Sequence, residues 1–193
     1  MVDIDGVLSL FGVPDLATGA PAPAARAPSG APPVGEAIEG SLHSIDGMLH
    51  FLSSTAAAHL LSLADSFELV WASGWEEKAD EHLPHLLGVP ARLPFLRFSR
   101  DVGGRGPAYP HWKLEAIEAY AGQRPLAWVD DAFNAACHEW AGARRAPTLL
   151  VQTEPTRGLT AHETKALRSW ALELGRGSSG RAPSSRVREP RAG

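Results

Sequence analysis

The chain has 193 residues, 44% hydrophobic and 7% aromatic, which is enough apolar material for one packed domain. It has no run of about 18 apolar residues and no basic region followed by an apolar stretch at its start, so we expect neither a membrane span nor a secretory signal. Its one cysteine, Cys137, excludes an internal disulfide and fits a reducing compartment, so we expect a cytoplasmic protein.

The net charge of −4 is unevenly distributed along the chain. Residues 175–193 carry five arginines and one glutamate, or +4, so the rest of the chain carries −8. An acidic body argues against a broad nucleic-acid-binding face. The end segment is rich in Gly, Ser and Pro and lacks apolar periodicity, which predicts a disordered basic tail over 175–193, solvated rather than bound to an acidic partner.

The first predicted element is a short apolar strand that ends in Asp3-Ile4-Asp5-Gly6. Residues two apart on a strand project to the same side, so Asp3 and Asp5 can converge on one point. Carboxylates so placed suit Mg²⁺, and a carboxylate can also attack phosphorus. The alternative is a hairpin turn at Asp5-Gly6. No partner strand is evident after this dipeptide, which favours the chemical reading. Only Met1 and Val2 precede Asp3, which is short for a buried strand, and we expect the natural strand to begin earlier.

Two further segments precede the main part of the domain. Residues 14–35 form a Pro/Ala-rich tract that cannot pack a core, which predicts a disordered insert. Residues 41–52 are two short apolar runs around Asp46-Gly47, which predicts a β-hairpin, and we expect it to form a small flap.

Helices and strands then alternate along the chain. We expect helices over 53–64, 75–87, 111–121, 132–143 and 160–174, strands over 67–72, 93–98, 125–129 and 148–152, and a loop over 100–110. Ser53 or Ser54 can cap the first of these helices, and Gly88 and Pro90 should end the second. Strands separated by helices of this length predict an α/β fold, a doubly wound (Rossmann-like) parallel sheet of about five strands. Its site should lie at the carboxyl ends of the strands, with no large cap domain beside it.

Three more groups fall at the predicted ends of strands or starts of helices. Ser73 and Gly74 follow a strand and precede a helix, a place where backbone N–H groups and a hydroxyl bind phosphate. Ser73 with Glu76 also fits a capping box. Lys113 falls in a first helical turn, where a cation opposes the helix dipole, so either a surface position or a role in neutralising phosphate fits.

Asp130 and Asp131 directly end the apolar run Leu126-Ala127-Trp128-Val129. Capping the next helix needs one acid only, so the second favours a cation held with Asp3 and Asp5. The histidines indicate less. His82 and His85 are three apart, but no third ligand with suitable spacing is evident and Pro84 disturbs the helix between them. His111 falls near Lys113, and Cys137 in a helix interior favours a buried, inert thiol.

Together, Asp3-Ile4-Asp5-Gly6-Val7-Leu8, Ser73, Lys113 and Val129-Asp130-Asp131 resemble the motifs of the haloacid dehalogenase-like (HAD) hydrolase superfamily, over roughly residues 1–174. The phrases around Trp71–Ala79, His111–Leu114 and Pro125–Asp131 are similar to a small bacterial subfamily, related to HAD domains found beside RNA-repair modules.

The resemblance implies a role for each residue. Asp3 would attack phosphorus and ligate Mg²⁺, and Asp5 would act as general acid and base, its backbone carbonyl completing part of the metal shell. Ser73, with Gly74, would bind the phosphoryl oxygens, and Lys113 would offset negative charge. Asp130 would bind the metal, and Asp131 would bind it or orient its waters. Such a division suits phosphoryl transfer, which is mostly positioning and charge neutralisation.

Three functions follow from this pattern. The first is a Mg²⁺-dependent phosphomonoester hydrolase, or phosphatase, whose open site admits a bulky phosphorylated substrate such as a nucleic-acid end. The second is a metal-independent dehalogenase, for which Asp5 and the Asp130-Asp131 pair have no purpose. The third is a non-catalytic binding module, in which the insert and the basic tail would be the working parts.

Overall fold

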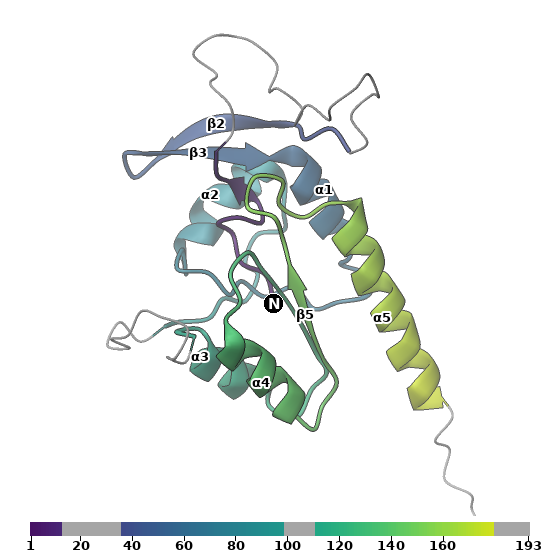
Figure 1. The fold of residues 1–193 in the computed structure, drawn as a ribbon. Coiled ribbons are helices and arrows are strands. Elements are labelled where there is room, and N and C mark those ends of the chain that lie inside the picture. The colour runs from purple at the N-terminus through teal and green to yellow at the C-terminus, as the bar shows by residue number, and fades with distance from the viewer. Residues whose placement is uncertain (13–35, 99–110, 180–193) are drawn as a thin grey trace, which may run out of the picture.

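The computed structural model describes residues 1–12, 36–98 and 111–179 (Figure 1). The insert predicted over 14–35, the whole loop predicted over 100–110 and residues 180–193 of the predicted tail lie outside the described residues.

The predicted hairpin is confirmed. Strands β2 (Gly40–Ile45) and β3 (Met48–Ser53) pair antiparallel in a register that sets Ile45 opposite Met48. The two turn residues have positive φ, 51° at Asp46 and 80° at Gly47, as a two-residue hairpin turn requires.

A third strand, β1 (Ser9–Leu10), pairs antiparallel with β3 on the side away from β2. A strand therefore does follow Asp5-Gly6, which the sequence did not indicate, but it pairs with the hairpin and not with the segment before the motif. Residues 5–8 turn tightly instead, because the N–H groups of Leu8 and Ser9 both donate to the Ile4 carbonyl, at 2.8 and 2.9 Å. Asp5-Gly6 is thus not a hairpin turn.

The regular parallel sheet has two strands, β4 (Leu126–Asp130) and β5 (Thr148–Gln152), paired from Leu126 with Thr148 to Asp130 with Gln152. The predicted sheet of five parallel strands is not shown. The other three segments join only by single bridges, from Val2 to both Val129 and Trp71, and from Trp71 to Phe95. These segments are short, and Pro94 has no N–H to extend its ladder.

Within the described ranges, five helices cover both faces of this parallel region: α1 (Ser54–Leu61), α2 (Lys78–Leu87), α3 (Leu114–Ala121), α4 (Ala135–Ala143) and α5 (Ala161–Ser179). Apolar side chains alternate between the faces along each strand. One core contains Val2, Ile4, Val129 and Val151 with residues of α1, α2 and α5, and the other contains Val70, Ala72, Leu126 and Trp128 with residues of α3 and α4. An α/β fold with helices on both faces is therefore shown.

The helix boundaries differ from the predicted ones at a few ends. Of the two serines that could cap α1, Ser53 does so, accepting the Ala56 N–H at 3.1 Å, and the left-handed Gly88 ends α2. However, α2 begins at Lys78 rather than at 75, and α5 continues to Ser179, so residues 175–179 of the predicted tail are helical. Among the described residues, no helix is long and apolar enough to cross a membrane. In Figure 1, β5 points toward the end of the molecule where the hairpin lies.

Candidate active site

A buried lysine joins two buried aspartates at the carboxyl ends of the parallel segments. The Nζ atom of Lys113 lies 2.6 Å from Oδ2 of Asp3 and 2.7 Å from Oδ2 of Asp130. The side chains of Lys113 and Asp130 are only 2% and 1% exposed. An unpaired charge at this depth would be strongly unfavourable, so the three groups depend on one another.

Lys113 occupies the N-cap position of α3, one residue before the helix begins. The sequence left open whether it is a surface residue or a charge in the site, and its burial shows that it belongs to the site. The dipole of α3 disfavours a cation at this end, and the two carboxylates offset that cost.

Asp130 and Asp3 are held in fixed orientations by further hydrogen bonds. Oδ2 of Asp130 also accepts the Trp128 indole N–H at 3.0 Å, and Oδ1 accepts the Ala132 backbone N–H at 3.1 Å. Oδ1 of Asp3 accepts the Ile4 backbone N–H at 2.8 Å. The role of Trp128 was missed from the sequence, although it stands two residues before Asp130 on β4, where both side chains project to the same side.

Asp131 completes a group of three carboxylates. One oxygen from each of Asp3, Asp130 and Asp131 lies within 4.8 Å of the others. Asp131 is half-buried, so the group opens toward solvent on its side. Such a cluster of hard oxygen donors, balanced within the described part of the chain by the Lys113 ammonium, has the chemistry of a divalent-cation site. Three of the four predicted metal ligands thus come together.

The carboxylate of Asp5 does not belong to this group of three. Instead, its Oδ2 atom accepts a hydrogen bond of 3.0 Å from the indole N–H of Trp75. Burial, and then the nearby charge of Asp3, raise the pKa of Asp5, so the two carboxylates lie near each other, but only Asp3 is grouped with Asp130 and Asp131. No local sequence pattern singled out Trp75, although it lies within Trp71–Ala79, one of the segments similar to the small bacterial subfamily.

Ser73 and Gly74 lie in the turn before α2 and not at its N-terminus, because α2 begins only at Lys78. The capping box does not form: the Glu76 carboxylate accepts the Phe98 N–H at 3.0 Å instead. The hydroxyl of Ser73 is buried beside Asp3 and helps to lower the pKa of that carboxyl, yet it reaches no hydrogen bond of normal geometry among the described residues. A buried hydroxyl in this state suits an incoming phosphoryl oxygen.

Burial and mutual repulsion raise the pKa of every carboxyl in the site. For Asp3 the largest cause is burial, which the nearby Lys113 ammonium opposes and Asp130 reinforces. Burial likewise raises the pKa values of Asp130, Asp131 and Asp5. The site in this form therefore resists full ionisation, and a bound cation would relieve that resistance.

The remaining candidates contribute less. Burial and the Lys113 charge lower the pKa of His111 to about 4, and its Nδ1 accepts the Lys113 backbone N–H at 3.3 Å, so it borders the site as a neutral ring. Among the described residues, no third ligand joins His82 and His85. Cys137 is fully buried and burial raises its pKa, which agrees with an inert thiol.

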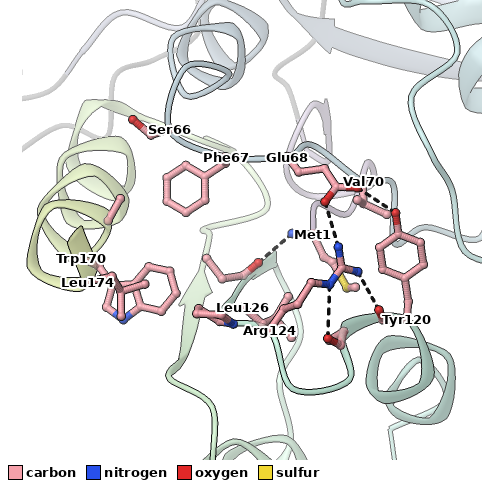
Figure 2. Close-up of a pocket in the computed structure, with 14 residues that line it drawn as sticks. Met1, Ser66, Phe67, Glu68, Val70, Tyr120, Arg124, Leu126, Trp170 and Leu174 are labelled. Atoms are coloured by element: carbon pink, nitrogen blue, oxygen red, sulfur yellow. Dashed lines mark hydrogen bonds and ion pairs between the residues drawn. The ribbon is translucent and has the colours of Figure 1, made fainter. Parts of the chain in front are cut away.

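A separate pocket of about 300 Å³ opens at the opposite, amino-terminal ends of the strands, lined partly by Phe67, Leu126 and Trp170 (Figure 2). Its polar groups bind one another: Arg124 and the Tyr120 hydroxyl both bond to Glu68 at 3.0 Å. The pocket contains none of the predicted site residues and has no cluster of metal ligands.

An α/β domain with this acid–lysine group at its strand ends has the plan of a HAD-like protein. Residues 1–164 match the family described as the HAD domain in Swiss Army Knife RNA repair proteins, and the chain belongs to this family. No curated protein and no solved structure gives a significant match to the chain.

Proposed function

We propose that this chain is a Mg²⁺-dependent phosphomonoester hydrolase that acts through an aspartyl-phosphate on Asp3. The observation that supports this most is the buried Lys113 ammonium, which lies 2.6 Å from Asp3 and 2.7 Å from Asp130. An ammonium in contact with a carboxylate nucleophile lets that carboxylate approach an anionic phosphate, because it cancels part of their repulsion.

Asp3 and Asp5 would carry out the two chemical steps, formation and hydrolysis of the aspartyl-phosphate. A carboxylate oxygen of Asp3 attacks phosphorus, the bond from phosphorus to the leaving oxygen breaks, and Asp5 gives that oxygen a proton. Asp5, now ionised, then takes a proton from water, whose oxygen attacks phosphorus and releases phosphate and the Asp3 carboxylate. The raised pKa of Asp5, caused by burial, suits a group that must begin the cycle protonated.

A divalent ion would be held by Asp3, Asp130 and Asp131, whose oxygens lie within 4.8 Å of one another. When bound, it would neutralise charge on the phosphoryl group. The Ser73 hydroxyl, buried and without a hydrogen bond among the described residues, would bind a phosphoryl oxygen, and the exposed Gly74 leaves the entrance open beside it.

Two other functions fit these residues less well. A dehalogenase needs an Asp nucleophile but has no use for two more carboxylates in the same group. A binding module gains nothing from burying Lys113 and Asp130, since such pairs are a weak source of stability. We therefore favour hydrolysis of a phosphate ester.

The substrate class we favour is a phosphorylated nucleic-acid end. The matched family is described by its occurrence in RNA repair proteins. Beside the site, Trp112 is 41% exposed, and its ring centroid lies 5.1 Å from the Lys113 ammonium. An exposed indole stabilises a stacked base by about 1–3 kcal/mol. An acidic domain binds a long phosphate backbone weakly, so contact with the end of a nucleic acid is a better fit than binding along its length.

The test is turnover of p-nitrophenyl phosphate and of a 2-haloacid, each with Mg²⁺ and with chelator. We expect only the phosphate ester to react, only with Mg²⁺, and not in the Asp3→Asn variant. Asp65→Asn, an exposed carboxylate outside the site, is the matched control. Haloacid turnover in chelator would establish the dehalogenase, and no turnover of either compound would favour the binding module. A panel of oligonucleotides with 3′ or 5′ phosphates then tests the substrate class.

A further inference from the structure

A chain of contacts links Asp5 to the hairpin. The Trp75 indole N–H donates to Oδ2 of Asp5 at 3.0 Å. The His50 and Trp75 rings pack edge to face, with centroids 4.9 Å apart and planes at 71°. His50 lies on β3, and its Nδ1 atom is 3.0 Å from the Ser9 hydroxyl on β1. Strand β3 therefore contacts Trp75 through His50, and β1 contacts His50 through Ser9.

The hairpin is tied to the Trp75 turn at a second place. Lys78, the first residue of α2, forms an ion pair with Asp46 in the hairpin turn. The Lys78 backbone N–H in turn donates to the Trp75 carbonyl at 2.9 Å. The hairpin thus reaches the Trp75 segment at two places, the Trp75 ring and the first residue of α2.

An indole N–H has one consequence for the carboxyl group that it binds. It is a donor only, and the carbonyl oxygen of a protonated carboxyl group is a better acceptor than its hydroxyl oxygen. The hydrogen bond to Oδ2 therefore favours the proton of a protonated Asp5 on Oδ1, the oxygen that the indole N–H does not contact.

We propose that Trp75, held in place by His50 of the hairpin, is a positioning residue that presents Oδ1 of the general acid Asp5 to the leaving group. This inference rests on the proposed function. In the first step the Oδ1 proton passes to the leaving oxygen as the phosphorus–oxygen bond breaks. In the second step the same oxygen takes a proton from water.

The dependence of the rate on the leaving group separates positioning from a structural role. p-Nitrophenolate departs readily without a proton, whereas phenolate depends on one. Trp75→Phe keeps an aromatic ring against His50 but removes the N–H donor. We expect kcat/KM for phenyl phosphate to fall at least about tenfold, a part of the factor of roughly 10² or more that general acid catalysis supplies. For p-nitrophenyl phosphate it should change less than about threefold.

Two hairpin variants provide the comparison. His50→Ala should shift the same ratio of the two substrates in the same direction, by a smaller factor. His43→Ala should leave the ratio unchanged, because His43 bonds to the Ser41 hydroxyl and, among the described residues, it is His50 whose ring packs against Trp75. These variants keep the inference testable even if Trp75→Phe does not fold.

The NMR chemical shift of the Trp75 indole N–H is a readout that needs no turnover, and its resonance is assigned by its loss in Trp75→Phe. This chemical shift should change in Asp5→Asn and in His50→Ala and stay the same in His43→Ala. The inference is overturned if the wild type is active but kcat/KM of the Trp75 and His50 variants falls equally for both esters. It is also overturned if the indole resonance does not move in Asp5→Asn. Either result leaves the proposed hydrolase intact. A wild type inactive on both esters overturns the proposed function, and the inference with it.

Discussion

Gly6 approaches Asp131 so closely that a β-carbon at position 6 would lie 2.5 Å from Cβ of Asp131. Gly6 also has a φ of 70°, and its carbonyl accepts the Thr153 hydroxyl at 2.9 Å. The glycine of the first motif thus does more than permit a turn. It lets the loop that carries Asp5 pack directly against one of the three clustered carboxylates, so the loop and the acidic group are built as one unit.

Gly6→Ala should destabilise the protein by roughly 2–4 kcal/mol, because the left-handed backbone costs about 1–2 kcal/mol and the contact with Asp131 adds strain. Gly47→Ala is the matched control, since Gly47 also has a positive φ, of 80°, but its β-carbon would meet nothing within 4 Å. Urea unfolding of both variants measures the difference. Equal losses at the two positions would show that the Asp131 contact has no energetic weight.

Lys113→Met should cost about 3–5 kcal/mol near neutral pH, because it leaves the buried Asp3 and Asp130 without a countercharge. Lys113 lowers the pKa of both carboxyls, so its loss should raise them further above their unfolded values. An acid with a raised pKa is stabilising at low pH and loses that contribution as the pH rises through its folded pKa. The variant should therefore be destabilised less at pH 5 than at pH 8. Unfolding in chelator at both pH values tests this, with exposed Lys165→Met as control. A loss that is the same at both pH values would contradict the prediction.

Mg²⁺ should stabilise the wild-type fold, by about 2.7 kcal/mol when its concentration is roughly a hundred times the dissociation constant. Asp131→Asn should raise the melting temperature in chelator slightly and reduce the Mg²⁺ response, because it removes both a ligand and a like charge near Asp3. Asp131 suits this test better than Asp130, whose oxygens accept three hydrogen bonds that an amide would disrupt. Melting curves with and without Mg²⁺ decide the matter, with Asp65→Asn as control. An undiminished response in Asp131→Asn would exclude it as a ligand.

The parts of this structure that local sequence controls were predictable. The hairpin follows from Asp46-Gly47, and the caps of α1 and α2 follow from Ser53 and Gly88. The grouping of Asp3 with Asp130 and Asp131 also followed, because the carboxyl ends of neighbouring parallel segments meet at one edge. Each of these depends on a turn, a cap or a strand end.

What the sequence did not reveal depends on contacts between distant segments. Ser9 lies 41 residues from His50, and Asp5 lies 70 residues from Trp75, in hydrogen bonds that no local pattern encodes. The extent of the sheet was overestimated for a related reason. Apolar runs such as 67–72 have strand composition, but a regular ladder also needs neighbouring segments that are long enough and can donate, and Pro94 has no N–H while the segment at Val2 is short.

His111 should contribute a pH-dependent stability of its own. Burial, and then the Lys113 charge, lower its pKa from 6.5 to about 4, while a bond to the Ala132 carbonyl opposes them. A histidine with a lowered folded pKa stabilises the protein above its unfolded pKa, and this contribution is lost as the pH falls through the folded value. Between pH 6.5 and about 4, the wild type should therefore lose up to about 2 kcal/mol more stability than His111→Gln. This is less than the full pKa shift would give, because the ring is only half-buried.

The site carboxyls titrate with the opposite sign, but they are present in both proteins and cancel in the comparison. Urea unfolding in chelator at half-unit pH steps provides the measurement, and exposed His85→Gln controls for the side-chain change. Parallel curves for wild type and His111→Gln across this range would show that His111 does not lie as a neutral ring beside Lys113.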